Sequence, residues 1–593
     1  MASIGLETQD SDGQMAGDLI DQHWSVCRAN LAVFDGVSAS SITERIQATR
    51  RMLEAELGAM QHVMCLVRNR QNDLAPISML PAEVLVNIFL RLPQSSESLG
   101  RSSEMRWIRA VSHVCHRWRE LALQSASLWI NINPSLGVQW VSEMLSRSRS
   151  APLRVTLDGS LLLGYLDAVR DNMFRTRHLQ LNIMSHKSKD ILYLFTMPAP
   201  MLEIIHIIGP FRDQDAHFPH RTLFSEITPK LRRVAIRNCV FSVTIPLFSG
   251  LAHLDIEIAY RHPGEEILPL GDSRETMLNR FFDCLELMPG LEFLRLIDCF
   301  GVDSTTTNLM NGRPTFQPPN LHTLIISDIQ PSCIAILDHI EARNLLDLSV
   351  AWKTIVWGLN EEFDPHLLAI IAARVLTMHK RTPFQYFELH SSDCALLVTS
   401  TNGRRYGVRL QCRKFEIDCI QDICRVLPLD EITELRIEVV RQDPWPPETW
   451  LEVFGRCKQV RNLHLETPEA ETICKALVPK AHADDTNKRS PLFRNLVTLR
   501  LDGPLERKVG RWIHNASSLG TVLKIHYRWL PHFLRKRKEA GMPIRTLLVS
   551  DTSLFGLPED AWIARLQETV EGECIINRSI WGRRESSWDP SLH

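Results

Sequence analysis

Few residues in this sequence combine a reactive side chain with the spacing that catalysis requires. The chain contains neither the phosphate-binding pattern G-x-x-x-x-G-K-[ST] nor the dinucleotide-binding pattern G-x-G-x-x-G. The zinc-protease pattern H-E-x-x-H and the serine-hydrolase pattern G-x-S-x-G do not occur in it either. Adjacent acids occur in ADDTNKR, residues 483–489, where a solvated loop is the better interpretation. We therefore predict a protein that is not an enzyme.

Cysteine and histidine spacing gives no support for a metal centre. The 14 cysteines form no C-x-x-C pair, and the nearest two, Cys419 and Cys424, are five residues apart. His113 and His116 are three apart, but no second pair completes a zinc site. Several cysteines, among them Cys457, lie in apolar runs, which is typical of buried free thiols in a reducing compartment. The sequence predicts no metal and no other cofactor.

The net charge and the hydropathy of the chain argue against a nucleic-acid-binding protein and against a membrane protein. The formal net charge is -2, so the chain has no global basic field for nucleic acid. We interpret its one dense basic run, LRKRKE at 534–539, as an exposed helix face rather than a nuclear import signal or phosphate patch. No stretch reaches the ~18 uncharged apolar residues that cross a bilayer, and the N-terminus lacks the pattern of a secretory signal. We expect a cytoplasmic or nuclear protein that neither enters membranes nor binds nucleic acid.

The stretch PISMLPAEVLVNIFLRLP, residues 76–93, predicts a short amphipathic helix. Pro81 suits a first helical turn, and Glu83 places a carboxylate at the positive helix end. Apolar residues then follow at helical spacing: Leu85, Ile88, Phe89 and Leu92.

A second helical run is predicted to begin near Ser103. Its apolar side contains Trp107, Val111, Val114, Trp118, Leu121 and Ala122, and Leu128 and Trp129 follow a polar turn. A unit of this length has more large apolar residues than three short helices need to cover one another. The surplus indicates an apolar surface that is left for a partner.

Together these two stretches resemble an F-box. The family pattern is Leu-Pro-x-Glu, apolar pairs, Leu-Pro, then Val-Cys-x-x-Trp-Arg and a final Leu-Trp. The matching residues here are Leu80, Pro81, Glu83, Val84, Leu85, Ile88, Phe89, Leu92, Pro93, Val114, Cys115, Trp118, Arg119, Leu121, Ala122, Leu128 and Trp129. The resemblance covers residues 76–132, and its departure is the long polar stretch at 94–106. That stretch is either a tolerated surface loop or a change in the register of partner binding.

The resemblance implies a role in protein degradation. In this family the F-box binds the Skp adaptor of a cullin–RING ubiquitin ligase, and the domain after it holds the substrate. The residues that would contact the adaptor are Leu80, Pro81, Val84, Leu85, Ile88, Phe89, Val114, Cys115, Trp118, Leu121 and Trp129. The alternative is a helical cap on a repeat scaffold, or an adaptor complex outside any ligase. A charge at Phe89 should abolish adaptor binding if that face is an interface, and unfold the cap if it is core.

Residues 1–72 precede this unit. Residues 1–40 are polar and weakly patterned, which indicates a disordered arm or a loose arm with one short helix near Trp24. Residues 41–72 carry one apolar helical stripe over about four heptads. Its members are Ile42, Ile46, Leu53, Leu57, Met60, Met64 and Val67. Thr49 and Glu56 interrupt a strict heptad, so both a coiled-coil-like, self-associating helix and a helix folded on the next domain remain open.

A short phrase recurs after residue 134: leucine, two residues, apolar, one residue, apolar. Clear copies begin at 231, 251, 291, 321, 432, 460 and 496, and weaker ones at 177, 202, 345, 414 and 544. In the last three positions of the phrase, two apolar residues flank one other residue. This alternation predicts a strand with one buried face. Amphipathic runs between copies predict helices, with Phe281, Leu285 and Met288 on one and Trp450, Phe454 and Cys457 on another. One strand and one helix per repeat resembles a degenerate leucine-rich repeat array, although a conventional α/β domain shares this phrase.

We therefore predict an α/β fold in which an N-terminal helix and a three-helix F-box cap an irregular leucine-rich-repeat-like solenoid. The predicted segments are a disordered arm (1–40), the amphipathic helix (41–72), the F-box (73–133) and the repeat-like domain (134–593). This order resembles the expanded F-box families of mushroom-forming fungi. It implies a non-catalytic substrate-recognition subunit of a Skp–cullin–F-box ligase. Its partners would be a Skp-type adaptor, through it a cullin, and a protein substrate that the sequence does not identify.

Overall fold

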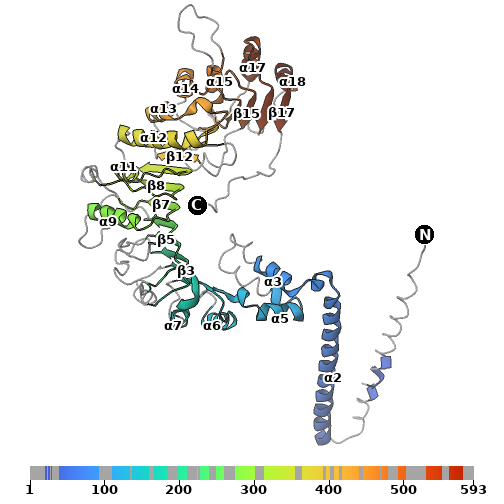
Figure 1. Cartoon of the computed structure of the whole chain (residues 1–593). Helices are drawn as coiled ribbons and strands as arrows, with labels where there is room; N and C mark the ends of the chain where they lie inside the picture. Colours follow the sequence, from blue (N-terminus) through green and yellow to red (C-terminus); the bar gives the residue numbers. More distant parts are fainter. Residues whose placement is uncertain are drawn as a thin grey trace, which may run out of the picture. The chain divides into compact units, whose positions relative to one another are not determined.

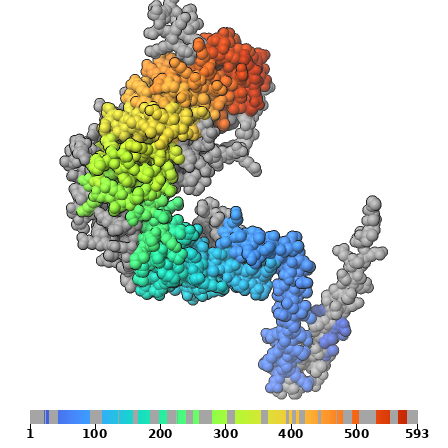
Figure 2. Space-filling model, in the orientation of Figure 1, coloured from blue at the N-terminus to red at the C-terminus, as the bar shows by residue number. Residues whose placement is uncertain are grey.

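The computed structural model describes most of the chain in segments. These are residues 21–22, 24–26, 28–29, 39–91, 110–133, 137–158, 166–182, 197–209, 224, 227–238, 249–258, 274–300, 313–353, 364–390, 395–400, 407–412, 417–439, 445–467, 469–478, 492–502, 529–550 and 560–577. The chain divides into two units, which Figure 2 shows in blue and in cyan to red. The first comprises residues 1–129 with 147–149, and the second 130–146 with 150–593.

The first unit is helical throughout its described regular elements. They are α2 (Ala39–Asp73), η1 (Pro76–Met79), α3 (Ala82–Arg91), α5 (His116–Gln124) and η3 (Ala126–Trp129). Helix α2 covers the segment 41–72, for which the sequence predicted a helix, and is slightly longer. In the arm before it, the described residues from 21 to 29 are helical. The rest of that arm and the polar stretch at 94–106 lie outside the described residues, so disorder in the arm stays a prediction.

The helix predicted in residues 76–93 begins where the sequence predicted. The carbonyl of Pro81 accepts hydrogen bonds from the backbone N–H groups of Val84 and Leu85, and these bonds start α3. The second predicted run, of which the part before residue 110 lies outside the described residues, is not one continuous helix. Residues 113 and 114 form a turn, and Cys115 is extended (φ -155°, ψ 168°) before α5. An extended residue cannot continue the helical hydrogen-bond ladder, so the run breaks there.

The second unit contains a long sheet, which has 17 strands among the described residues. They are β1 (Asn131–Ile132), β2 (Leu153–Asp158), β3 (Thr176–Asn182), β4 (Ile204–Ile208), β5 (Arg233–Arg237), β6 (His253–Glu257), β7 (Phe293–Ile297), β8 (Thr323–Ile329), β9 (Asp347–Lys353), β10 (Tyr386–His390), β11 (Ala395–Thr399), β12 (Gly407–Cys412), β13 (Glu434–Glu438), β14 (Asn462–Leu465), β15 (Thr498–Asp502), β16 (Thr546–Ser550) and β17 (Glu573–Asn577). The α/β class is therefore confirmed (Figure 1).

Strand order follows the chain except at one insertion. Strands β1 to β9 pair in sequence and in parallel, and so do β13 to β17. Between these two runs, β9 pairs in parallel with β12, and β10 pairs in parallel with β13. Strand β11 joins β12 and β10 by antiparallel pairing. The segment β10–β12 is thus a three-stranded meander inserted in reverse order, which the sequence did not predict.

Helices lie along one side of the sheet in Figure 1. The described helices of this unit are α6 (Val138–Arg147), α7 (Leu166–Arg170), η5 (Met173–Arg175), α9 (Arg274–Glu286), α11 (Gln330–His339), α12 (Pro365–Arg381), α13 (Ile417–Val426), η9 (Leu429–Glu431), α14 (Pro447–Phe454), α15 (Ala470–Ala476), α17 (Leu530–Glu539) and α18 (Asp560–Thr569). From α11 to α15 each helix contacts the next, and α17 contacts both α15 and α18.

The recurrent phrase explains the core between the strands and helices. In the copy at 291, Leu291, Leu294 and Leu296 are all buried, and Arg295, between the last two, lies on the other face. The predicted helical positions Phe281, Leu285, Met288, Trp450, Phe454 and Cys457 are buried as well. The strand alternation and the helical stripes therefore bury their apolar residues in one layer between sheet and helices.

One local prediction is wrong, and another holds except at one residue. The weak copy at 414 is not a strand in its described part, because Ile417 begins α13. There the residues Ile420, Ile423, Cys424 and Leu427 are buried at helical spacing, which overrides the local alternation. The basic run 534–539 lies on α17, and Arg535, Lys536, Lys538 and Glu539 are exposed as predicted, but Arg537 is fully buried. Its guanidinium donates to the carbonyl oxygens of Leu477 (2.8 Å) and Phe493 (3.1 Å).

The described residues can be searched for disulfide bonds and for membrane-spanning helices. The described cysteines are free, and Cys299 and Cys457 are buried. Burial raises the pKa of the Cys457 thiol to about 12, which keeps it protonated and inert. No helix among the described residues has the length and apolar character that a bilayer crossing requires.

Candidate functional site

The predicted adaptor-binding residues lie on α3, α5 and η3 and in the turns directly before α3 and α5, around a small core. Leu85 and Phe89 of α3 are fully buried, and the Phe89 ring packs at 4.9 Å against Trp118 of α5. The indole N–H of Trp129 donates to the carbonyl oxygen of Ala122 (2.8 Å), which fixes η3 under α5. A side-chain N–H of Arg117 donates to the carbonyl oxygen of Leu80 (2.9 Å), which ties α5 to the turn before α3.

An apolar surface lies beside this core. On α3, Val84 and Ile88 are four residues apart and 41% and 38% exposed, whereas Leu85 and Phe89, the next residues along, face inward. Val114, in the turn before α5, is 52% exposed. Pro81 is exposed, and Leu80, Cys115, Trp118 and Leu121 are half-buried. The side chains available for a partner are therefore these eight of the eleven predicted residues.

The remaining three predicted contact residues require a correction. Leu85, Phe89 and Trp129 are 0%, 0% and 2% exposed, so they support the surface from beneath and are not part of it. The sequence stripe on α3 was read as one face, but it contains both the core side and the exposed side. A charge at Phe89 is accordingly expected to unfold this unit, which is the second of the two outcomes given above for that change.

Two exposed apolar residues were missed by the sequence analysis. Ile77 and Met79 on η1 are 43% and 78% exposed, directly before Leu80. The sequence signal that could have identified them is the alternation Ile77-Ser78-Met79, with a polar residue between two apolar ones. In the structure Ser78 is buried and its two apolar neighbours are exposed. They extend the exposed apolar surface of α3 toward the N-terminus.

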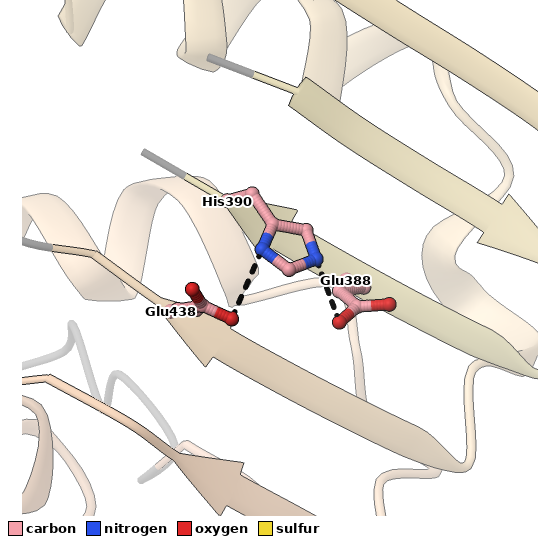
Figure 3. A group of neighbouring side chains, drawn as sticks. All are labelled: Glu388, His390 and Glu438. Carbon is pink, nitrogen blue, oxygen red and sulfur yellow. Dashed lines mark ion pairs between the residues drawn. The ribbon is translucent and has the colours of Figure 1, made fainter. Parts of the chain in front are cut away.

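A second group of residues stands out on the sheet, where the sequence predicted no site. Glu388 and His390 on β10 lie beside Arg436 and Glu438 of β13, in the parallel register of the two strands. Figure 3 shows the imidazole of His390 between the carboxylates of Glu388 and Glu438. The distances are 2.7 Å from Nε2 to Glu388 and 3.1 Å from Nδ1 to Glu438.

Arg436 connects this group to the next strand. Its guanidinium lies 3.1 Å from Glu388, 3.3 Å from Glu438 and 2.9 Å from Glu466, which directly follows β14. We call these five residues the charge cluster; its carboxylates are at most 8% exposed. Three carboxylates surround two cationic groups, so protonated His390 still leaves one negative charge in excess.

The excess negative charge controls the protonation of His390. Burial lowers its pKa, but the hydrogen bonds and charges of Glu388 and Glu438 outweigh burial and raise the pKa to about 9. Burial also raises the pKa of Glu388, and here His390, Arg436 and the Tyr386 hydroxyl outweigh it and lower the pKa. The result is an imidazolium held between two carboxylates at neutral pH.

The donors of the charge cluster could by type also hold a divalent cation. Glu388, His390 and Glu438 place one ligand atom each within 4.8 Å of one another. However, both ring nitrogens already face a carboxylate, and the Arg436 guanidinium contacts both carboxylates. A metal ion would have to replace the imidazolium proton next to a fixed positive charge. The arrangement therefore favours a proton over a metal at this position.

A smaller charged group occupies the same side of the sheet between β5 and β7. Arg295 of β7 lies 2.7 Å from Asp255 and 2.9 Å from Glu257, both on β6. Arg237 of β5 approaches Glu257 at 3.6 Å. Together with the charge cluster, this group makes the strand face away from the helices polar and charged.

Comparison with known proteins identifies the first of these two regions. Residues 77–135 match the family model described as F-box-like, which spans η1, α3, α5, η3 and β1. This match supports the predicted F-box. No curated protein matches the chain.

Proposed function

We propose that this chain is a non-catalytic substrate-recognition subunit of a Skp–cullin–F-box ubiquitin ligase. The observation that carries the proposal is the exposed apolar surface of Val84, Ile88 and Val114, which lies within the F-box-like match. A surface of this kind, set on a rigid helical core, fits a hydrophobic contact with a Skp-type adaptor. The adaptor would connect the chain to a cullin.

The mechanism in this proposal is proximity. One end of the chain binds the adaptor, and the sheet unit binds a target protein. The target's lysine side chains are then held near the ubiquitin carrier of the ligase, at a high effective concentration. No residue of this chain needs to take part in the chemistry.

The proposed role of the sheet unit rests on its repeat-like build. We interpret residues 134–593 as an irregular leucine-rich-repeat-like solenoid. In-register parallel strands support this, with buried leading residues such as Leu231 and Leu251 and a helix after many of the strands. The meander β10–β12 departs from the pattern. The polar strand face offers charged side chains for target contact.

The decisive experiment is binding of a purified Skp-type adaptor to the full chain and to a surface variant, Val84→Glu with Ile88→Glu. Both side chains are partly exposed, so the variant should fold as the parent does. We expect nanomolar binding by the parent and a loss of about 100-fold or more in the variant, because each position would face the apolar centre of the interface. Calorimetric titration measures the affinity, and circular dichroism checks the fold.

A matched control uses the same chemistry elsewhere. Leu346→Glu with Leu376→Glu also replaces two apolar side chains, which are 40% and 43% exposed on the sheet unit. This control should bind the adaptor as the parent does. No binding by the parent, or equal loss in both variants, would contradict the proposal and favour a repeat scaffold whose F-box-like unit has another use.

A further inference from the structure

Among the described elements, α2 carries the most exposed large apolar residues. Eight of the 24 exposed large apolar residues in the described chain lie on it: Ile46, Met52, Leu57, Met60, Val63, Met64, Leu66 and Val67. Within the described part of the chain, its main contact is with the short η1 at its end. Most helices in folded proteins are stabilised by packing of an apolar face, and among the described residues the apolar side chains of α2 are largely exposed along its 35 residues.

The apolar residues of α2 form a short continuous seam. Leu53, Leu57, Met60, Met64 and Val67 follow one another at intervals of four, three, four and three residues. This alternation is the a/d spacing of a coiled coil. Ile46 extends the seam by one further heptad, with Arg50 in the seam position between Ile46 and Leu53. In this register Glu56 flanks the seam and does not interrupt it.

The charged residues that flank the seam are arranged asymmetrically. Glu54 and Glu56 lie on either side of its N-terminal half, and Arg68 and Arg70 lie on either side of its C-terminal half. In a parallel pair, Glu54 would neighbour Thr49 of the second copy, Glu56 would neighbour Gln61, and the two Arg50 side chains would meet. A parallel pair therefore forms no ion pair between the two helices from these charges; the Arg50–Glu54 ion pair, at 2.8 Å, lies within one helix.

In an antiparallel pair, Glu54, Glu56, Arg68 and Arg70 would all form ion pairs between the two helices. With a two-fold axis near residue 62, Glu54 of each copy lies opposite Arg68 of the other, and Glu56 opposite Arg70. Symmetry makes this four ion pairs, and it separates the two Arg50 side chains. We propose that α2 is the dimerisation element of this protein and that it pairs with a second copy of itself in an antiparallel coiled coil.

The antiparallel arrangement determines where the two F-box-like units of the dimer lie. A helix of 35 residues is about 50 Å long at 1.5 Å per residue. Because η1 and α3 follow the C-terminal end of α2, an antiparallel pair places the two F-box-like units at opposite ends of the paired helices. The inference rests on α2 alone and is independent of adaptor binding.

The first test is the mass of the full chain in solution, measured by sedimentation and light scattering at micromolar concentration. We expect twice the chain mass of 67.9 kDa. Leu57→Glu with Met64→Glu places charges in the seam and should give monomers. Met52→Glu with Leu66→Glu makes the same change on the outer side of α2, where these residues are 42% and 54% exposed, and should leave the dimer intact. A monomeric parent, or equal behaviour of the two variants, would overturn the proposal.

The second test addresses orientation and keeps the seam unchanged. Glu54→Arg with Glu56→Arg puts like charges opposite each other in the antiparallel pair, and should weaken association at least about tenfold. Adding Arg68→Glu and Arg70→Glu restores all four pairs with the signs exchanged, and should restore the parent affinity. In a parallel pair the first change acts only through the contact of Glu54 with Arg50 of the same helix, and the second change cannot restore the affinity. No weakening by the first change, or no recovery with the second, would refute the antiparallel arrangement.

Discussion

Among single residues, His390 offers the clearest dependence on pH. Its pKa is about 9 in the folded chain and about 6.5 in an unfolded one, so folding favours the charged form. The stabilisation is complete below pH 6.5 and is lost as the pH rises through 9. We expect the free energy of unfolding to fall by about 1–3 kcal/mol over that window because of this residue. Urea denaturation at several pH values measures it.

Two variants separate His390 from the other titrating groups of the chain. His390→Gln should remove most of the fall between pH 6.5 and 9. His366→Gln changes a histidine whose side chain is 59% exposed, and should leave the fall as in the parent. If the two variants keep the same slope, the imidazolium of the charge cluster is not what stabilises the fold.

Residues of this kind could not be found from the sequence. Glu388 and Glu438 are 50 positions apart and meet only because β10 pairs with β13 across the inserted meander. Arg537 looked like one charge in an exposed basic run, and only the carbonyl groups of Leu477 and Phe493 explain its burial. The F-box residues are different, because their motif is local. The sequence located that motif but not the division between exposed Ile88 and buried Phe89.

For the secondary structure elements, local pattern was a good guide wherever each strand pairs with the next. The copies at 231, 251, 291 and 321 became β5, β6, β7 and β8 because alternation buries their leucines in one layer. The meander has no such signal. Strands β10, β11 and β12 lack the leading phrase, and the pairing of β9 with β12 joins segments that are not consecutive in the chain. The break at Cys115 was missed for a similar reason, since apolar spacing continues through the turn.

Gly407, at the start of β12, tests how closely the meander is packed. A Cβ atom there would collide with the carbonyl oxygen of Val398 on β11, a backbone atom that cannot move aside. Gly407→Ala should therefore lower the free energy of unfolding by about 1–3 kcal/mol. Gly290→Ala is the matched control, because its Cβ would lie 3.8 Å from the nearest carbonyl oxygen. The control should stay within about 0.5 kcal/mol of the parent. Equal unfolding midpoints in urea would contradict the pairing of β11 with β12 described here.

For the whole molecule, the important property is that the two units have cores of different kinds. The helical unit closes around Leu85, Phe89 and Trp129, whose neighbours are close in sequence. The sheet unit instead stacks strand on strand, so each strand depends mainly on the two beside it. Proteins built in this way commonly depart from all-or-none unfolding.

We therefore predict that the two units unfold in separable transitions in scanning calorimetry of the full chain. Phe89→Asp buries an unpaired charge in the helical unit and should abolish the smaller transition, leaving the larger one unchanged. Leu463→Ala truncates a side chain of β14 that is 1% exposed. It should lower the free energy of unfolding of the sheet unit by about 2–5 kcal/mol, while the midpoint of the smaller transition stays unchanged. A single transition that both substitutions move together would mean that the units fold as one body. In that case a change on the exposed surface of α3 would also change the stability of the sheet. The adaptor affinities would then have to be compared together with the unfolding free energies of the parent and the variant.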